Sequence, residues 1–188
     1  MILLGITGGI ASGKSFISNM LKEKYNAYVF DADSEAKKLL FTEEISNLVL
    51  DAFPELESIT LESLAKAAFK DKSSQDKLNR IIHPAVGKEA LKRIEEINEL
   101  GQHSIFVIDA PLIIEGSSYK NYKEKGALII LVTAPENIRM ERALSRGDLS
   151  RNTIQDRMNL QWSDDKKKDY ADYVIVNNSS LDLSLIHI

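Results

Sequence analysis

The sequence of 188 residues contains no cysteine, and this absence excludes two kinds of protein at once. Without thiols the chain has neither a disulfide framework nor thiolate chemistry, which suits a reducing compartment. Basic residues are not in excess either, because 24 lysines and arginines stand against 28 aspartates and glutamates, for a net charge of −4. We therefore expect no broad basic surface and no nucleic acid among the partners.

Long apolar runs are also missing from the sequence. None approaches the ~20 residues that a membrane-spanning helix requires. The first residues, Met1 to Thr7, carry no cluster of positive charge and lead into glycines, so a signal peptide is not expected. These features predict a cytoplasmic protein with no membrane partner. The length fits a single folding unit, present as a monomer or a small homo-oligomer.

Arginine is scarce over most of the chain and concentrated in one stretch. Five of the seven arginines fall within residues 139–157, and lysine supplies nearly all the other positive charge. These five are Arg139, Arg142, Arg146, Arg151 and Arg157. Because the planar guanidinium suits bidentate contacts with phosphate, the concentration indicates a segment that handles phosphate groups.

Short apolar runs recur along the chain and alternate with helical patterns. Strands are expected at residues 2–7, 27–31, 104–109, 127–132 and 173–176. Strands that are apolar throughout and separated by helices are typical of a parallel sheet covered on both faces. The sequence therefore predicts an α/β fold of three layers, in which helices cover both faces of a five-stranded parallel sheet.

Two helical stretches interrupt this alternation. Residues 41–101 show no strand pattern, and helices are expected at 43–51, 60–69, 73–82 and 85–100, the last beginning at Pro84. Residues 135–170 form a second helical stretch, in which Ser150 is a candidate N-cap. The expected division is a core of 1–40, 102–134 and 171–188, a helical region of 41–101 and a lid of 135–170.

Residues 8–15 match the phosphate-binding pattern G-x-x-x-x-G-K-[ST] between an expected strand and an expected helix. They are Gly8, Gly9, Ile10, Ala11, Ser12, Gly13, Lys14 and Ser15. Glycines let backbone N–H groups surround an anion, and the helix that follows directs its positive end toward it. Lys14 is expected at the β- and γ-phosphates and the Ser15 hydroxyl at Mg²⁺. The pattern predicts a P-loop kinase-like fold that binds ATP and Mg²⁺.

Carboxylates follow two of the expected strands. Asp31 and Asp33 close the second strand and Asp109 closes the third, where ligands of parallel sheets bind. Asp33 could accept the proton of an acceptor hydroxyl, unless Asp33 or Ser34 instead caps the next helix. Asp109 resembles the acid that supports Mg²⁺ through water or through Ser15, and the alternative is a turn residue.

Arg139, Arg142 and Arg146 are spaced to share one helical face. A solvated face is the alternative, but it does not explain arginine in place of lysine. Kinases need cations over the transferring phosphoryl group, so we expect phosphate contacts from Arg142, Arg146 and Arg157. Weaker candidates remain open: His83 could bind a ligand or cap a helix, and Gln161 and Trp162 could border an adenine or pack in the core.

Taken in order, these motifs resemble the dephospho-CoA kinase family over nearly the whole chain. The resemblance begins with the extended P-loop of residues 5–15 and Asp31-Ala32-Asp33. It continues through Leu-Asn-Arg-Ile-Ile-His-Pro at 78–84, Asp-Ala-Pro-Leu-Ile-Ile-Glu at 109–115, Glu-Arg-Ala-Leu-Ser-Arg at 141–146 and Ala-Asp-Tyr-Val-Ile-Val-Asn at 171–177. Many kinases share the P-loop, whereas the later segments are far more specific.

The resemblance implies phosphorylation of the ribose 3′-hydroxyl of dephospho-CoA, the last step of coenzyme A synthesis, with ATP and dephospho-CoA as small-molecule partners. It places Asp33 near the acceptor ribose beside Asp31, and Lys14 and Arg142 on the phosphates. It also implies that region 41–101 binds CoA and that the acceptor pocket is shaped by His83, Pro111 and Leu112.

Two departures from the family pattern lie near the C-terminus. Asn177-Asn178-Ser179 stands where the family usually has Asn followed closely by Gly, and the chain stops at Ile188, where relatives usually run on through a final helix. Residues 181–188 are too short for a stable isolated helix and are expected to be loosely held. The alternatives to the family assignment are another P-loop kinase, for a nucleotide, shikimate or gluconate, and a nucleotide-dependent switch ATPase.

Overall fold

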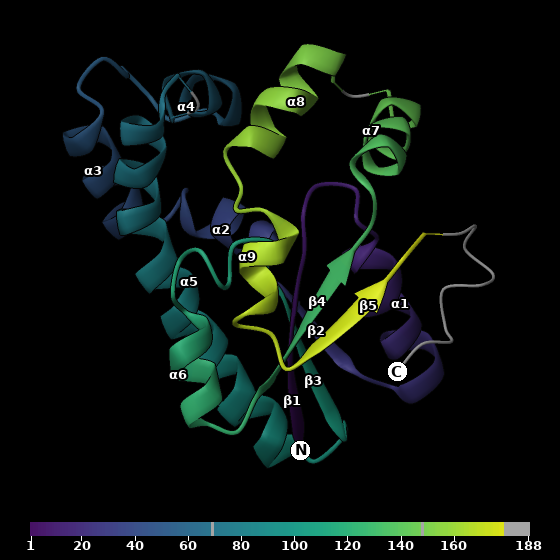
Figure 1. Cartoon of the computed structure of the whole chain (residues 1–188). Helices are drawn as coiled ribbons and strands as arrows, with labels where there is room; N and C mark the ends of the chain where they lie inside the picture. The colour runs from purple at the N-terminus through teal and green to yellow at the C-terminus, as the bar shows by residue number, and fades with distance from the viewer. Residues whose placement is uncertain (69, 148, 179–188) are drawn as a thin grey trace. The chain divides into compact units, whose positions relative to one another are not determined.

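The computed structural model describes residues 1–68, 70–147 and 149–178 (Figure 1). Contacts between residues divide the chain into two compact units, one formed by Met1–Phe30 with Leu100–Ile188 and the other by Asp31–Glu99. The segment 181–188, expected to be loosely held, lies outside the described residues. In the part of the chain that the structure describes, no helix is both long enough and apolar enough to cross a bilayer.

The first unit is built on a five-stranded sheet with the order β2-β3-β1-β4-β5. The strands are β1 (Ile2–Thr7), β2 (Tyr28–Asp31), β3 (Ile105–Asp109), β4 (Leu128–Thr133) and β5 (Tyr173–Val176). β1 pairs in parallel with both β3 and β4, and β4 pairs in parallel with β5. The predicted α/β fold with a five-stranded parallel sheet is confirmed, and each strand begins and ends within one residue of its predicted bounds.

Helix α1 (Lys14–Tyr25) covers the sheet beside β1 and β3. Its buried Ile17 packs in one cluster with Ile6 of β1 and Val107 of β3. Burial of such side chains stabilises the fold by about 1.5–3 kcal/mol each. The helix ends at Asn26, whose φ of 51° is left-handed, a conformation that asparagine tolerates better than most residues. Helix α1 begins at Lys14, within the expected phosphate-binding segment of residues 8–15.

Four further helices belong to the first unit among its described residues. They are α6 (Tyr119–Glu124), α7 (Glu136–Ser145), α8 (Arg151–Asn159) and α9 (Asp164–Lys168). Ser150 caps α8 as predicted, because its hydroxyl oxygen accepts a hydrogen bond of 3.2 Å from the N–H of Thr153. Helix α6 was not predicted, because its single buried side chain, Tyr122, gives no periodic pattern.

The second unit is helical. It contains α2 (Ala32–Leu39), α3 (Glu43–Ala52), α4 (Leu61–Ala68) and α5 (Lys72–Leu100), the last of which ends one residue beyond the unit. The predicted helix break at Pro84 is wrong, because α5 runs through this proline as one helix of 29 residues. The buried face of α5 keeps its spacing across the proline, through Ile82, Val86, Ala90, Ile94 and Ile97. That continuous face outweighs the cost of the missing backbone N–H, about 3 kcal/mol.

Asp172 ties the start of β5 to β4. Its carboxylate accepts hydrogen bonds from the Ile129 N–H at 2.7 Å and from the Lys123 ammonium at 2.8 Å. Burial acts to raise the pKa of Asp172, but these hydrogen bonds and the charge of Lys123 outweigh it, and the pKa lies below the ordinary value of 3.8. The ionised carboxylate therefore stabilises the fold.

Asp172→Asn should lower the free energy of unfolding by about 1–2 kcal/mol at pH 7, because the charged acceptor of two hydrogen bonds is lost. A lowered folded-state pKa gives stability that is complete above the unfolded pKa of about 3.9 and is lost as pH falls through the folded value. Urea unfolding from pH 7 to pH 3 should show the two proteins converging in acid. Asp169→Asn, at an exposed carboxylate, is the control. A difference that stays constant with pH would contradict the role of the charge.

Candidate active site

The loop between β1 and α1 has the backbone of an anion-binding site. Gly13 precedes α1 with φ of 106°, a left-handed value that favours glycine, and Ala11 has φ of 58°. Lys14 is the first residue of α1, and the first turn of that helix contains no acidic side chain. The positive end of the helix is therefore not offset by a carboxylate of its own first turn.

Side chains from distant parts of the first unit cover this loop closely. A Cβ atom added to Gly13 would overlap the Asn177 side chain, and one added to Gly9 would overlap the Arg139 guanidinium. Glycine is therefore favoured at position 13 by both its positive φ and the close approach of Asn177, whereas a side chain at position 9 would displace the end of Arg139. The loop is therefore contacted by Asn177 and Arg139, which lie outside the sequence motif of residues 8–15.

Asn177 is the most connected of these neighbours and is only 2% exposed. Its Nδ2 donates to the carbonyl of Ser12 at 2.9 Å, and its Oδ1 accepts from an Arg142 Nη2 at 3.3 Å. Its own N–H donates to the carbonyl of Thr133 at 2.7 Å. Asn177 therefore links the loop to α7 and to the end of β4. No role was predicted for Asn177, because no pattern in a single sequence indicates this contact.

Gln161 anchors the other side of the loop. Its Oε1 accepts a hydrogen bond of 3.0 Å from the N–H of Ile10. Gln161, for which an adenine contact and core packing were both left open, is half-buried and contacts the loop backbone. Arg139, whose role no pattern predicted, lies over Gly9, and its Nε is buried without a hydrogen-bond partner.

Helices α7 and α8 pack against each other and against the phosphate-binding loop. Figure 1 shows the two helices near one another beyond β4. Their buried Met140 and Ile154 form a hydrophobic cluster with Ala11 of the loop. The stretch predicted as a lid is therefore packed on the loop in this structure.

The arginines of this stretch differ in their surroundings. Arg142 reaches the loop through Asn177, as described, and Arg157 lies half-buried in α8. Arg146 is exposed at the C-terminal end of α7. The helical spacing therefore brings Arg139 and Arg142 to the loop, and Arg146 lies one turn further along.

Asp109 ends β3, in register with Ile6 of the neighbouring β1. Its Oδ2 accepts a hydrogen bond of 2.8 Å from the hydroxyl of Ser18. Ser18, which was not among the predicted site residues, lies one turn beyond Lys14 in α1. A serine inside a helix carries no signal of its own, and only the pairing of β1 with β3 brings Asp109 toward α1.

Pro111 and Leu112 lie in the turn after β3, and both are half-buried. The hydroxyl of Thr7, the last residue of β1, donates to the carbonyl of Pro111 at 3.0 Å. The start of this turn is therefore attached to the strand that leads into the phosphate-binding loop.

The remaining predicted site residues belong to the second unit. Asp31 caps α2, because its Oδ1 accepts from the N–H of Ser34 at 2.9 Å, so capping falls to neither Asp33 nor Ser34. The prediction that both aspartates close the second strand is wrong for Asp33, because β2 ends at Asp31 and Asp33 lies exposed in the first turn of α2. His83 is half-buried inside α5, and because no helix begins there it caps none.

A phosphate-binding loop at the end of a parallel sheet, followed by a helix that begins with lysine, defines a P-loop phosphotransferase. Within that class, the family model described as Dephospho-CoA kinase matches residues 2–182. The chain belongs to the dephospho-CoA kinase family. The resemblance stated from the motifs is confirmed.

Known proteins agree with this assignment. A dephospho-CoA kinase of Aquifex aeolicus is 34% identical over 186 residues, which cover 95% of this chain and 90% of the relative. Among solved structures, TT1252 from Thermus thermophilus has a TM-score of 0.76 and 27% identity, covering 96% of this chain and 90% of its own. A shikimate kinase from Acinetobacter baumannii reaches a TM-score of 0.61 at 14% identity, covering 98% and 89%. The fold is thus shared with a shikimate kinase, so the fold alone does not identify the substrate that accepts the phosphoryl group.

Proposed function

We propose that the protein transfers the γ-phosphoryl group of ATP to the ribose 3′-hydroxyl of dephospho-CoA, giving coenzyme A and ADP. The match to the dephospho-CoA kinase family over residues 2–182 is the observation that carries this proposal. The 3′ oxygen attacks the γ-phosphorus while the bond from that phosphorus to the β–γ bridging oxygen breaks. The hydroxyl proton passes to a carboxylate of the protein.

The donor end of the reaction is assigned to residues 8–15 and to the arginines beyond β4. The backbone N–H groups of the loop and the N-terminus of α1 would surround the ATP phosphates, with Lys14 at the transferring group. We assign Arg142 to the same phosphates, and its hydrogen bond to Asn177, which itself contacts the loop, supports this assignment. We assign Arg146 and Arg157 to charge neutralisation in the transition state, with residues 135–170 acting as the lid.

The oxygen atoms of the two side chains proposed as metal ligands are of the kind that binds Mg²⁺. Ser15 offers a hydroxyl oxygen and Asp109 a carboxylate, the hard oxygen ligands that this ion takes. Among the described residues no group of three or more His, Cys, Asp or Glu could hold a metal. Magnesium in phosphotransferases is usually bound through one or two protein oxygens, waters and substrate phosphates, so a dedicated cluster is not required. The ion would neutralise charge on the phosphates. The hydrogen bond from the Ser18 hydroxyl to Asp109 links the end of β3 to α1.

The acceptor end is assigned to Asp33 as the carboxylate that orients the 3′-hydroxyl and accepts its proton. Asp31, His83, Pro111 and Leu112 are assigned to the acceptor pocket, and the helical region 41–101 to the remainder of the CoA moiety. Asp33 is exposed and in the first turn of α2, and is therefore open to a substrate. We also propose that the protein acts in the cytoplasm as a monomer or small homo-oligomer.

The test is ATP consumption with and without dephospho-CoA. ADP release should require the acceptor, and the product should carry a new phosphate on the 3′ oxygen. Shikimate, gluconate and nucleoside monophosphates serve as control acceptors, since the fold is shared with a shikimate kinase. Turnover with one of these and none with dephospho-CoA would overturn the assignment. ADP release without any acceptor would favour a switch ATPase.

A further inference from the structure

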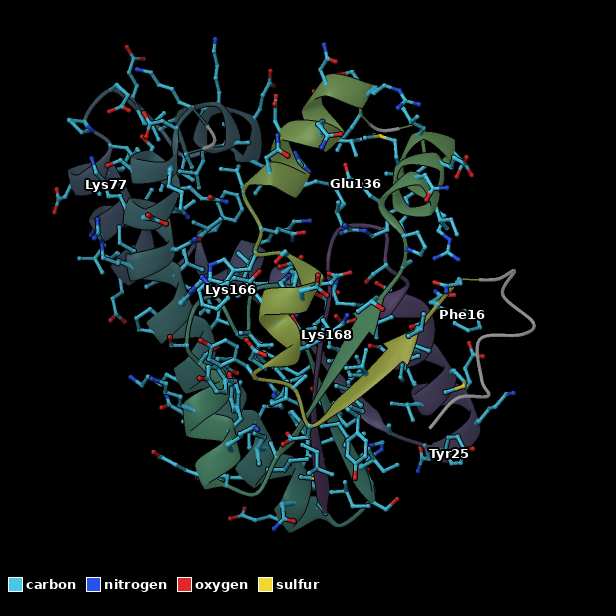
Figure 2. All side chains as sticks on the ribbon, viewed as in Figure 1. Phe16, Tyr25, Lys77, Glu136, Lys166 and Lys168 are labelled. Carbon is cyan, nitrogen blue, oxygen red and sulfur yellow. The ribbon has the colours of Figure 1, made fainter. Side chains whose placement is uncertain are left out.

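Lys167 is a lysine with no exposed surface at all. It lies in α9, a helix of five residues, between Lys166 and Lys168, which are both exposed (Figure 2). Removing an ammonium group from water costs several kcal/mol, which an apolar side chain at the same position would not incur. The burial of this one lysine therefore needs a reason beyond filling space.

Glu115 is the charge partner of Lys167. Lys167 Nζ lies 2.8 Å from Glu115 Oε1, and the glutamate side chain is only 11% exposed. The groups meet as an ion pair without the angles of a directed hydrogen bond. Glu115 lies in the turn that follows β3 and begins with Pro111 and Leu112. The buried pair thus attaches the far end of that turn to α9.

Aromatic contacts also connect the residues around α9 to the start of α6, which follows the same turn. The ring of Tyr170, just after α9, lies 5.7 Å from that of Trp162, just before it. The centroid of the Tyr119 ring is also 5.7 Å from that of Tyr170, in an edge-to-face arrangement. Tyr119 is the first residue of α6 and follows the turn that carries Glu115. Contacts of two different kinds therefore hold segment 161–170 against this turn.

The other end of segment 161–170 touches the ATP loop. Gln161 accepts the hydrogen bond from Ile10 N–H, six residues before Lys167. One segment thus contacts the phosphate-binding loop and the turn assigned to the acceptor.

We propose that Lys167 and Glu115 are positioning residues, which hold the turn containing Pro111 and Leu112 in the conformation that binds the acceptor. This inference rests on the proposed function, in which that turn contributes to the acceptor pocket. Neither residue touches the reacting atoms. Their effect passes through the turn, whose start is fixed to Thr7 and whose end is fixed to α9.

The experiment compares Lys167→Met, Glu115→Gln and the double variant with the wild type. Each single variant should raise KM for dephospho-CoA about tenfold or more, because a small shift of the residues that bind a substrate weakens its binding strongly. The KM for ATP should stay within about twofold. Because the two residues act as one unit, the double variant should be no worse than either single variant. Calorimetric binding of dephospho-CoA without ATP should weaken in parallel.

Lys168→Met is the matched control. Lys168 pairs with Asp165 at the same 2.8 Å, but the two side chains are 48% and 90% exposed. Exposed pairs contribute little, so both KM values and the melting temperature should remain those of the wild type. The control separates loss of any α9 ion pair from loss of the buried one.

A purely structural pair would give a different result. The variants would melt at lower temperature, yet the folded enzyme would keep both KM values, and that result would overturn the proposal. An equal rise in both KM values would overturn it too. If Lys167→Met does not fold, Glu115→Gln, which preserves side-chain size, carries the test. Failure of the proposed function is seen separately, as absence of dephospho-CoA turnover by the wild type.

Discussion

Replacing Lys14 with alanine should reduce kcat by about a thousandfold or more while leaving the fold intact. Lys14 is the first residue of α1, directly after the left-handed Gly13, and its ammonium is expected at the β- and γ-phosphates. Charge that develops on the transferring group would lose its nearest protein cation. Arg142 is assigned to the same phosphates in the wild type, so it supplies no additional cation when Lys14 is removed. Turnover at saturating ATP and dephospho-CoA is the measurement.

The control for this variant is Lys22→Ala, at an exposed lysine of the same helix. Both variants shorten a lysine to alanine, so any general effect on α1 should appear in the two alike. Circular dichroism and melting temperature should match the wild type for both. Near-normal turnover by Lys14→Ala at saturating ATP would mean that the phosphate-binding loop has been assigned wrongly.

Asp33→Asn should lose most of kcat, about a hundredfold to ten-thousandfold, while affinity for ATP changes little. Asparagine keeps the size of aspartate but cannot take the proton of the 3′-hydroxyl. Since Asp31 and not Asp33 caps α2, the substitution should not unfold that helix. Steady-state kinetics with each substrate varied in turn separates the effect on kcat from the effect on binding.

Glu35→Gln provides the comparison for Asp33→Asn. Glu35 lies in the same first turn of α2 and pairs with Lys38 at 2.6 Å. Its loss removes one carboxylate from the same helix end without touching the proposed base, so kcat should be unchanged. Equal losses in the two variants would indicate an electrostatic effect of α2 as a whole. Wild-type kcat in Asp33→Asn would exclude Asp33 as the proton acceptor.

The strands could be predicted because each is an apolar run that is buried by its neighbours. β4, for example, has four of its six residues buried, and its composition alone indicates a central strand. Pro84 shows where such reasoning fails. A local rule for proline predicts a helix boundary, but the apolar face that continues from Ile82 to Val86 is a longer-range property and prevails.

The candidate site divides in the same way. Residues 8–15 are contiguous, so their chemistry can be recognised from spacing. Asn177 and Gln161 hold that loop from 165 and 151 residues away along the chain. Their side chains are brought there by the order of β1, β4 and β5, which no local pattern specifies. The cap of α2 could not be predicted either. Asp33 and Ser34 were the candidates, but the backbone path makes Asp31 the cap.

The contact of Ala11 with Met140 and Ile154 has a thermodynamic consequence for nucleotide exchange. If α7 and α8 lift away to release ADP, the methyl group of the loop and the side chains around it become hydrated. Hydration of apolar surface raises the heat capacity, so the enthalpy of opening would grow with temperature. A van 't Hoff plot for the opening equilibrium would therefore curve. The protein would in this way couple the ease of product release to temperature, through a hydrophobic cluster that includes one residue of the phosphate-binding loop.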